Sequence, residues 1–420
     1  KPLKKSGISR LQIHNTVFPN RVYATAKFNK ILFLLHELIQ QLLIENELHT
    51  DEFLQKKLLL RNLGQRNAAN AYSKHRQSVT EISPQFPVRD GEFFLQQSQL
   101  MHEQQNALHT NLVGNADQEY ILPHIHQLDN AYLFFRLKME CEHLNRHRIY
   151  AAPTTPTTAS LLLDFIETTN INLEPTVAIY RSILLLLLRP AQLEQFREVL
   201  ADIKKYRGHY RPAEAREALQ FLLNYAYYQV NQQQPDFLPL LLELFQFGLQ
   251  REILLPEGYL TDATFTNIVS AGLANGELEW TQKFIEKYEG KIIAEHRINA
   301  RSLAYANLYY HQQQYQLAAA ALTAVNHRLD NYQIRARILE LRLYYEDQLQ
   351  TPSQLTGDLE RKIAAYLRWL YDQKDVFASD KLYLYRNFCR ALEKLYYYQQ
   401  SAVQNPTAHA QLTTEVESYF

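Results

Sequence analysis

The sequence predicts an all-α protein, a right-handed α-α superhelix (solenoid) built from stacked helical hairpins. Two features of the composition favour helices: the chain of 420 residues contains only 11 glycines, and 46% of its residues are apolar. Leu, Ala, Gln and Glu lose little conformational freedom in a helix, whereas a sheet-rich chain of this length needs many more turn glycines. The third observation is the spacing of apolar residues, which recur three and four positions apart along most of the chain.

The first 30 residues predict a basic, partly disordered arm, because they contain seven Lys or Arg and no acidic residue. Such a charge run is usually a solvated segment, and the alternative is contact with an anionic partner. An irregular helical N-terminal region is expected over 31–150. Its predicted helices are 31–62, 64–76, 92–113 and 117–148, and Thr50-Asp51 offers a second helix start within the first of them.

The clearest linker is 151–160, a Pro- and Thr-rich segment without an apolar period. It separates the N-terminal region from a helical-hairpin repeat array over 158–400, which is followed by a tail over 401–420. Helices in the array are predicted at 158–168, 175–188, 190–206, 212–230, 236–251, 262–274, 277–289, 297–312, 314–326, 330–348, 355–373 and 379–400.

A repeat signal supports the array. Leu308-Tyr309-Tyr310 recurs as Leu343-Tyr344-Tyr345, 35 residues later, and a shift of 37 residues backwards places Gly276 at a turn. Small residues allow two helices to approach closely, and aromatic residues fill the space to the next hairpin. The pattern around the first copy resembles the tetratricopeptide repeat, with Ala306, Tyr309, Tyr315, Ala318, Leu322 and Val325 at the matching positions. The C-terminal half is therefore predicted to be tetratricopeptide-like.

The layout from Phe28 to Gln400 also resembles an uncharacterised family of helical-repeat proteins from Bacteroidetes. The resemblance is carried by Phe28-Asn29-Lys30 and by a long segment ending in Cys-Glu-x-Leu-Asn-Arg, which comprises Leu128-Asp129, Tyr132, Arg136-Leu137-Lys138, Glu140-Cys141-Glu142, Leu144 and Asn145-Arg146. The sequence departs from that family at Met139 and His143. The resemblance implies a helical-repeat fold and a bacterial cytosolic setting, and it implies no catalytic residues.

No motif in the sequence indicates an enzymatic reaction. The sequence lacks the glycine-rich phosphate loops and the G-x-S-x-G nucleophile turn, and His36-Glu37 lacks the second histidine of a zinc helix because Gln40 stands there. We therefore expect a protein that is not an enzyme and has no cofactor. The two cysteines, Cys141 and Cys389, and the short longest apolar run predict a cytoplasmic protein without a membrane segment.

The best metal candidate is the group of Cys141, His143, His147, His124 and His126. His143 and His147 share one helix face, but Cys141 points away from them, so no metal site is assigned and metal binding remains a third hypothesis.

The predicted function is that of a non-enzymatic scaffold which binds a partner protein or peptide on the concave face of the array. Arginine binds carboxylates in a bidentate manner, and tyrosine supplies contact area at a low entropy cost. The residues expected to line that face are Asn307, Tyr310, His311, Arg335, Arg342 and Tyr345. RNA binding is the alternative, because aromatic side chains can stack on bases and the N-terminal arm is basic, although the zero net charge argues against it.

Overall fold

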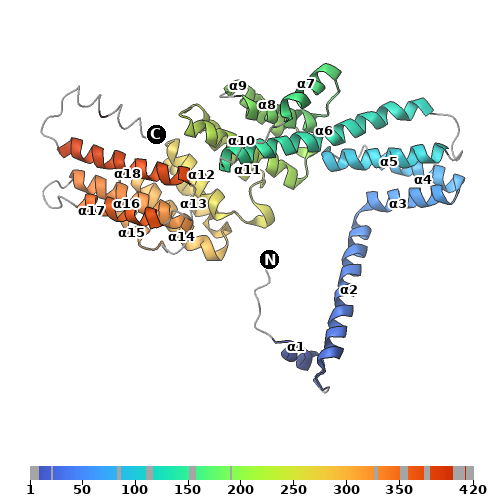
Figure 1. The fold of residues 1–420 in the computed structure, drawn as a ribbon, viewed down its shortest axis with the longest axis horizontal. Helices are drawn as coiled ribbons and strands as arrows, with labels where there is room; N and C mark the ends of the chain where they lie inside the picture. The colour runs from blue at the N-terminus through green and yellow to red at the C-terminus, as the bar shows by residue number, and fades with distance from the viewer. Residues whose placement is uncertain are drawn as a thin grey trace. The chain divides into compact units, whose positions relative to one another are not determined.

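The computed structural model describes residues 9–19, 22–82, 87–109, 117–150, 158–189, 192–325, 330–350, 358–372, 379–400 and 412. Regular structure in these residues is helical, apart from one isolated β-bridge between Leu260 and Ile292, so the all-α prediction is confirmed. The helices (Figure 1) are α1 (Arg10–Val17), α2 (Thr25–Thr50), α3 (Glu52–Gln65), α4 (Ala69–Ile82), α5 (Gly91–His109), α6 (Asp117–Tyr150), α7 (Ala159–Thr169), α8 (Pro175–Leu188), α9 (Leu193–Lys205), η2 (Arg207–His209), α10 (Pro212–Asn231), α11 (Phe237–Gln250), η3 (Pro256–Gly258), α12 (Asp262–Ala274), α13 (Leu278–Tyr288), η4 (Glu289–Lys291), α14 (Ala294–His311), α15 (Tyr315–Leu322), α16 (Asp330–Gln350), α17 (Asp358–Asp372) and α18 (Ser379–Gln400).

Most predicted helices agree with the observed ones to within a few residues, and α8, α12 and α18 have the predicted ends. The predicted segment 31–62 comprises two helices. Asp51 leaves the helical conformation, and its carboxylate accepts a hydrogen bond of 2.8 Å from the Leu54 amide at the start of α3. An N-cap of this kind satisfies a backbone donor that the new helix leaves unpaired.

Part of the predicted basic arm is helical. Ser9 caps α1, because its hydroxyl accepts from the Gln12 amide while the Gln12 side chain accepts from the Ser9 amide. His14 of α1 packs edge-on against Phe28 of α2, with ring centroids 5.4 Å apart. Residues 1–8, the linker segment 151–157 and most of the predicted tail lie outside the described residues.

The chain forms two compact units, and their boundary differs from the predicted one. The first unit comprises 1–140, 157–181 and 206–211, and the second comprises the remaining segments. The chain returns to the first unit after the linker because Tyr180 of α8 packs on Phe134 of α6, with centroids 4.9 Å apart, and the Tyr210 hydroxyl donates to the Thr176 carbonyl. Contacts distant in sequence therefore set the boundary.

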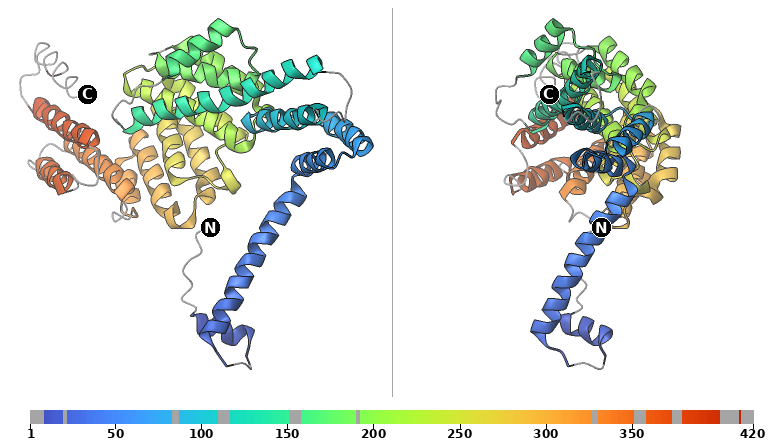
Figure 2. Two further views of the ribbon diagram at one scale, coloured as in Figure 1. Left: turned by 45° about the vertical axis from the view of Figure 1, so that its right-hand side comes forward. Right: turned by 90° about the vertical axis from the view of Figure 1, so that its right-hand side faces the viewer.

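In the second unit, α10 with α11, α12 with α13, α14 with α15 and α16 with α17 pack as consecutive pairs, and α14 also packs between α12 and α16 (Figure 2). Close approach within pairs depends on small residues. Ala306 and Ala318 are completely buried between α14 and its neighbours, and a Cβ at Gly272 of α12 would overlap the Thr281 side chain of α13.

One turn geometry recurs between the paired helices. Gln233, Gly276 and Gln313 each have a positive φ, of 58°, 74° and 61°, and the next amide bonds back to the carbonyl five residues earlier. This is the hydrogen bonding of a Schellman helix end, which requires a left-handed residue after the helix. The two glutamine tracts, 232–234 and 312–314, are therefore tight inter-helix turns.

Among the described residues, no helix combines the length and the apolar character that crossing a membrane requires.

Candidate functional site

An open groove of about 180 Å³ lies in the second unit where α12, α14 and α16 pack side by side. Its lining residues come from all three helices: Thr266, Ser270, Asn307, Arg335, Ile338, Leu339 and Arg342. Arg335, Ile338, Leu339 and Arg342 follow the spacing of three and four residues that places side chains on one face of α16.

Three lining residues are separated by the offsets of the predicted repeat. Ser270 precedes Asn307 by 37 residues, the offset that relates Gly276 to Gln313, and Arg342 follows Asn307 by 35, the offset of the Leu-Tyr-Tyr repeat. The groove is therefore lined by corresponding positions of α12, α14 and α16, which are every second helix in this part of the chain.

The polar groups of the groove are mainly acceptors on α12 and α14. The Thr266 and Ser270 hydroxyls donate to carbonyls of their own helix, at 2.7 and 3.0 Å, so their lone pairs remain available. The Asn307 amide nitrogen likewise donates to the Leu303 carbonyl at 2.8 Å, which leaves its side-chain oxygen as an acceptor. These atoms suit backbone N–H groups of a bound chain.

Arg335 and Arg342 supply the donors. Both side chains are exposed, and neither forms an ion pair with a carboxylate in the part of the chain that the structure describes. Arg335 reaches Asn267 Oδ1 at 3.5 Å, and the Arg342 guanidinium lies 5.5 Å from the centre of the Phe388 ring. Two exposed guanidinium groups can bind carboxylates of a partner.

The charge of Arg335 acts on tyrosines from three helices. Burial raises the pKa of Tyr227 on α10, Tyr332 on α16 and Tyr385 on α18, and the positive charge of Arg335 opposes that rise in each. The Tyr227 hydroxyl also donates to the Asn267 carbonyl at 3.2 Å.

The structure brings together Asn307, Arg335 and Arg342 of the six predicted residues. Tyr310, at the end of α14, donates a hydrogen bond of 3.1 Å to Glu346 Oε1, and burial together with this carboxylate raises its pKa to about 12. Burial and the nearby Arg342 charge lower the pKa of His311. Tyr345 packs against the apolar cluster of α16, α17 and α18. These three side chains are not among the lining residues of the groove.

Sequence reasoning missed Thr266 and Ser270, because the predicted face began at α14. The 37-residue offset was available as a signal, since it leads from Asn307 directly to Ser270.

A second pocket, of about 600 Å³, lies between α11 and α13 and was also not predicted. Three lysines four residues apart line it, Lys283, Lys287 and Lys291, beside the aromatic residues Trp280, Phe284 and Tyr288. The rings stack along α13 with centroids 5.6 and 5.1 Å apart. No ion pair among the described residues involves these lysines, so the pocket presents positive charge beside aromatic surface.

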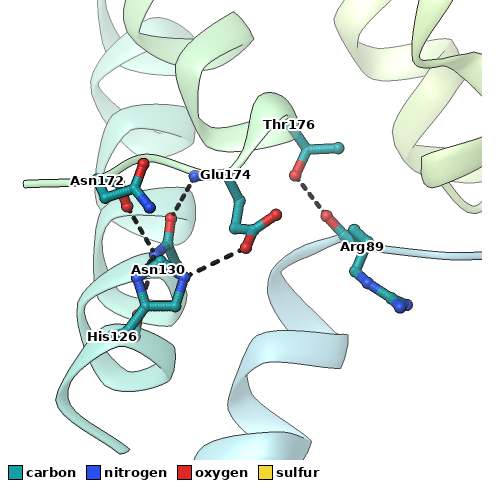
Figure 3. Close-up of polar contacts among 6 residues, drawn as sticks. All are labelled: Arg89, His126, Asn130, Asn172, Glu174 and Thr176. Atoms are coloured by element: carbon teal, nitrogen blue, oxygen red, sulfur yellow. Dashed lines mark hydrogen bonds and ion pairs between the residues drawn. The ribbon is translucent and has the colours of Figure 1, made fainter. Parts of the chain in front are cut away.

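Two histidines of the metal candidate, His124 and His126, have other partners. His126 Nε2 lies 3.2 Å from Glu174 Oε1 and its Nδ1 lies 3.3 Å from Asn130 Nδ2 (Figure 3), whereas His124 Nε2 lies 3.3 Å from Ser98 Oγ. Within the described segments, no group of three or more His, Cys, Asp or Glu side chains is arranged to hold a metal ion.

The network around His126 has a structural role. Asn130 is completely buried. Its side-chain oxygen accepts a hydrogen bond of 2.8 Å from the Glu174 amide, and its side-chain nitrogen donates hydrogen bonds of 2.9 and 3.3 Å to the carbonyls of His126 and Asn172 (Figure 3). The Thr176 hydroxyl donates to the Arg89 carbonyl in the same region. These bonds hold the start of α8 against α6 and the segment before α5.

Comparison of this chain with protein-family models, with curated proteins and with solved structures gave no match.

Proposed function

We propose that this protein is a non-enzymatic scaffold of the tetratricopeptide-like superhelical type, and that it binds an extended, acidic segment of a partner protein in the groove of α12, α14 and α16. The observation that carries the proposal is that Arg335 and Arg342 of α16 line one groove together with the acceptors of Ser270 on α12 and Asn307 on α14. Donors of that kind suit carboxylates, and the acceptors suit peptide N–H groups.

Several observations support this function. The groove is partly open to solvent, which suits a chain that lies across it better than an enclosed small molecule. The partly exposed side chain of Ile338 lies between the two arginines on α16 and offers contact area for an aliphatic or aromatic residue. Both cysteines are buried and neither is in a disulfide, which supports a reducing compartment such as the cytoplasm.

The test measures binding of fluorescent peptides to the full chain. The probes are an alanine-based peptide with Asp and Glu side chains and a matched peptide in which these are Lys. We expect saturable binding of the acidic peptide alone, weakened at least about tenfold in the Arg335→Ala/Arg342→Ala variant, since each lost charge-assisted hydrogen bond contributes on the order of 1.5 kcal/mol or more.

The matched control is Arg251→Ala/Arg368→Ala, which removes the same charge from exposed positions outside the groove. If both double variants weaken binding equally, the peptide responds to net charge and the groove is not its site.

The second candidate function is binding of single-stranded RNA, and the pocket of α11 and α13 favours it. Lysines four residues apart beside aromatic rings combine the two elements that single-strand binders use, a basic track and a stacking surface. Affinity for a labelled RNA oligonucleotide should then fall steeply with salt and fall further in Lys283→Gln/Lys287→Gln.

Each double variant serves as the control for the other function. The arginine variant should leave RNA binding unchanged, and the lysine variant should leave peptide binding unchanged. Unchanged RNA affinity in the lysine variant would remove this second candidate.

A further inference from the structure

Helix α2 carries an apolar surface that its own unit leaves uncovered. Between Ile31 and Ile44, nine large apolar side chains are 42–68% exposed: Ile31, Phe33, Leu34, Leu35, Leu38, Ile39, Leu42, Leu43 and Ile44. In the whole helix only Phe28 is buried. Within its unit, α1 contacts the first turns of α2, and α3 contacts its C-terminal end. Of the helices that the structure describes in that unit, none runs alongside the length of α2 (Figures 1 and 2).

This exposure is a physical anomaly. A helix owes most of its stability in a protein to the packing of its apolar face, and a helix that is apolar on most sides is normally buried. Exposed apolar patches of this extent mark interaction surfaces. The segment between Ile31 and Ile44 therefore needs a partner.

The charges on α2 indicate which partner fits. Lys27 and Lys30 stand just before the apolar segment, and Glu45 and Glu47 stand just after it. All four side chains are exposed, and none forms an ion pair among the described residues. The helix thus has a basic end and an acidic end, with the apolar segment between them.

We propose that α2 pairs in an antiparallel manner with α2 of a second copy of this chain. The two lysines and the two glutamates lie equally far from the middle of the apolar segment, near Glu37 and Leu38. A two-fold axis at that point covers the apolar segment of each copy with that of the other, and it places the basic end of each opposite the acidic end of the other. Self-complementarity of this kind is what a two-fold symmetric interface requires.

The size of the surface is sufficient for a dimer. Six of these side chains lie on one face of α2, at spacings of three and four residues: Ile31, Leu34, Leu35, Leu38, Ile39 and Leu42. Each is about half exposed, so a partner helix that covers this face buries roughly 600 Å² per chain, which is the lower end of the range for a stable interface. The charges at both ends select the antiparallel orientation, because a parallel pair would place lysines opposite lysines and glutamates opposite glutamates.

The experiment is sedimentation velocity of the full chain over a wide range of concentration. We expect a dimer that Leu38→Asp/Leu42→Asp converts to a monomer. The matched control is Leu122→Asp/Leu161→Asp, which adds the same charges at equally exposed leucines and should leave the dimer intact. Circular dichroism checks that each variant keeps its helix content.

Charge variants test the orientation. Lys27→Glu/Lys30→Glu should weaken the dimer at least about tenfold, because like charges then face each other. Adding Glu45→Lys/Glu47→Lys to the same chain should restore it. A monomeric wild-type chain, a dimer that survives Leu38→Asp/Leu42→Asp, or a charge-reversed chain that the second pair of substitutions does not restore would each overturn the proposal. Co-sedimentation of a monomeric chain with lipid vesicles would likewise assign the surface to a membrane instead.

Discussion

Gln313 occupies in the α14–α15 turn the position that Gly276 occupies in the α12–α13 turn, and both residues have a left-handed backbone, with φ of 61° and 74°. Glycine adopts this conformation without strain, whereas a residue with a Cβ is disfavoured there by about 1–2 kcal/mol. The α14–α15 turn thus stores backbone strain that its counterpart avoids.

We therefore expect Gln313→Gly to stabilise the protein. The gain should be about 0.5–1 kcal/mol, because the added freedom of glycine in the unfolded chain offsets part of the relieved strain. Urea denaturation measures it. The control is Gln312→Gly, whose φ of −81° needs no glycine and which should therefore destabilise the protein. Equal effects of the two substitutions would contradict the assigned turn geometry.

Gly272→Ala should destabilise the second unit. The new Cβ would overlap the Thr281 side chain and press on the Trp280 ring, and overpacking of this kind costs about 1–3 kcal/mol. Gly290→Ala is the matched control, since no atom lies within 4 Å of a Cβ at that position. Thermal unfolding distinguishes the two variants, and an unchanged melting temperature for Gly272→Ala would show that α12 and α13 can separate at no cost.

The Tyr310–Glu346 hydrogen bond should contribute measurable coupling between α14 and α16. We expect a double-mutant cycle of Tyr310→Phe and Glu346→Gln to give a coupling free energy of about 0.5–1.5 kcal/mol. The cycle is needed because Tyr315 also lies close enough to Glu346 for this carboxylate to raise its pKa. Additive free energies of unfolding in the cycle would mean that the bond contributes no net stability.

The pKa of His311 should depend on Arg342. In the wild-type protein it lies below the ordinary value of 6.5, so this histidine contributes stability that is complete above about pH 6.5 and is lost as the pH falls through the folded pKa. Arg342→Gln should raise the pKa, as measured by NMR titration of the ring protons. Arg335→Gln is the control, because Arg335 is not among the charges that act on His311. If the pKa of His311 responds equally to both substitutions, it depends on the net charge of the protein and not on its proximity to Arg342.

Both thiols should resist modification in the folded protein. Cys141 and Cys389 are completely buried, and burial raises the pKa of the Cys389 thiol to about 12, with the Glu393 carboxylate adding to the rise. A thiol-specific chromogenic reagent at about pH 8 should therefore react with neither cysteine until urea unfolds the chain, and then with both. Rapid reaction of one thiol before unfolding would reveal local opening at its helix.

Helix positions were largely predictable from the sequence because their signals are local. The apolar period, the N-cap at Asp51 and the turn at Gly276 each involve residues only a few positions apart in the sequence. The observed helices begin and end where these signals predict. The two-unit boundary was not predictable in this way. It depends on Tyr180 and Tyr210 packing back on the first unit, and contacts across such sequence distances leave no local pattern.

The candidate groove was predictable in part for the same reason. The repeat offset led to Asn307 and Arg342, because equivalent residues of stacked helices face the same side. The same offset does not predict the hydrogen bond from Tyr310 to Glu346, or the packing of Tyr345 against the apolar cluster of α16, α17 and α18. Side-chain partners from other helices decided those orientations.

By itself, the sequence determined that this chain is helical, where most helices begin and end, and which face of α14 and α16 repeats. Hydrogen bonds within a helix and the preferences of single residues are short-range, so they can be read along the chain. Only the tertiary structure decided that Ser270 joins Arg342 in one groove, that Lys283 and Trp280 share a pocket, and that the apolar side of α2 stays exposed. Those outcomes depend on which helices pack against each other, because packing alone determines which side chains are covered.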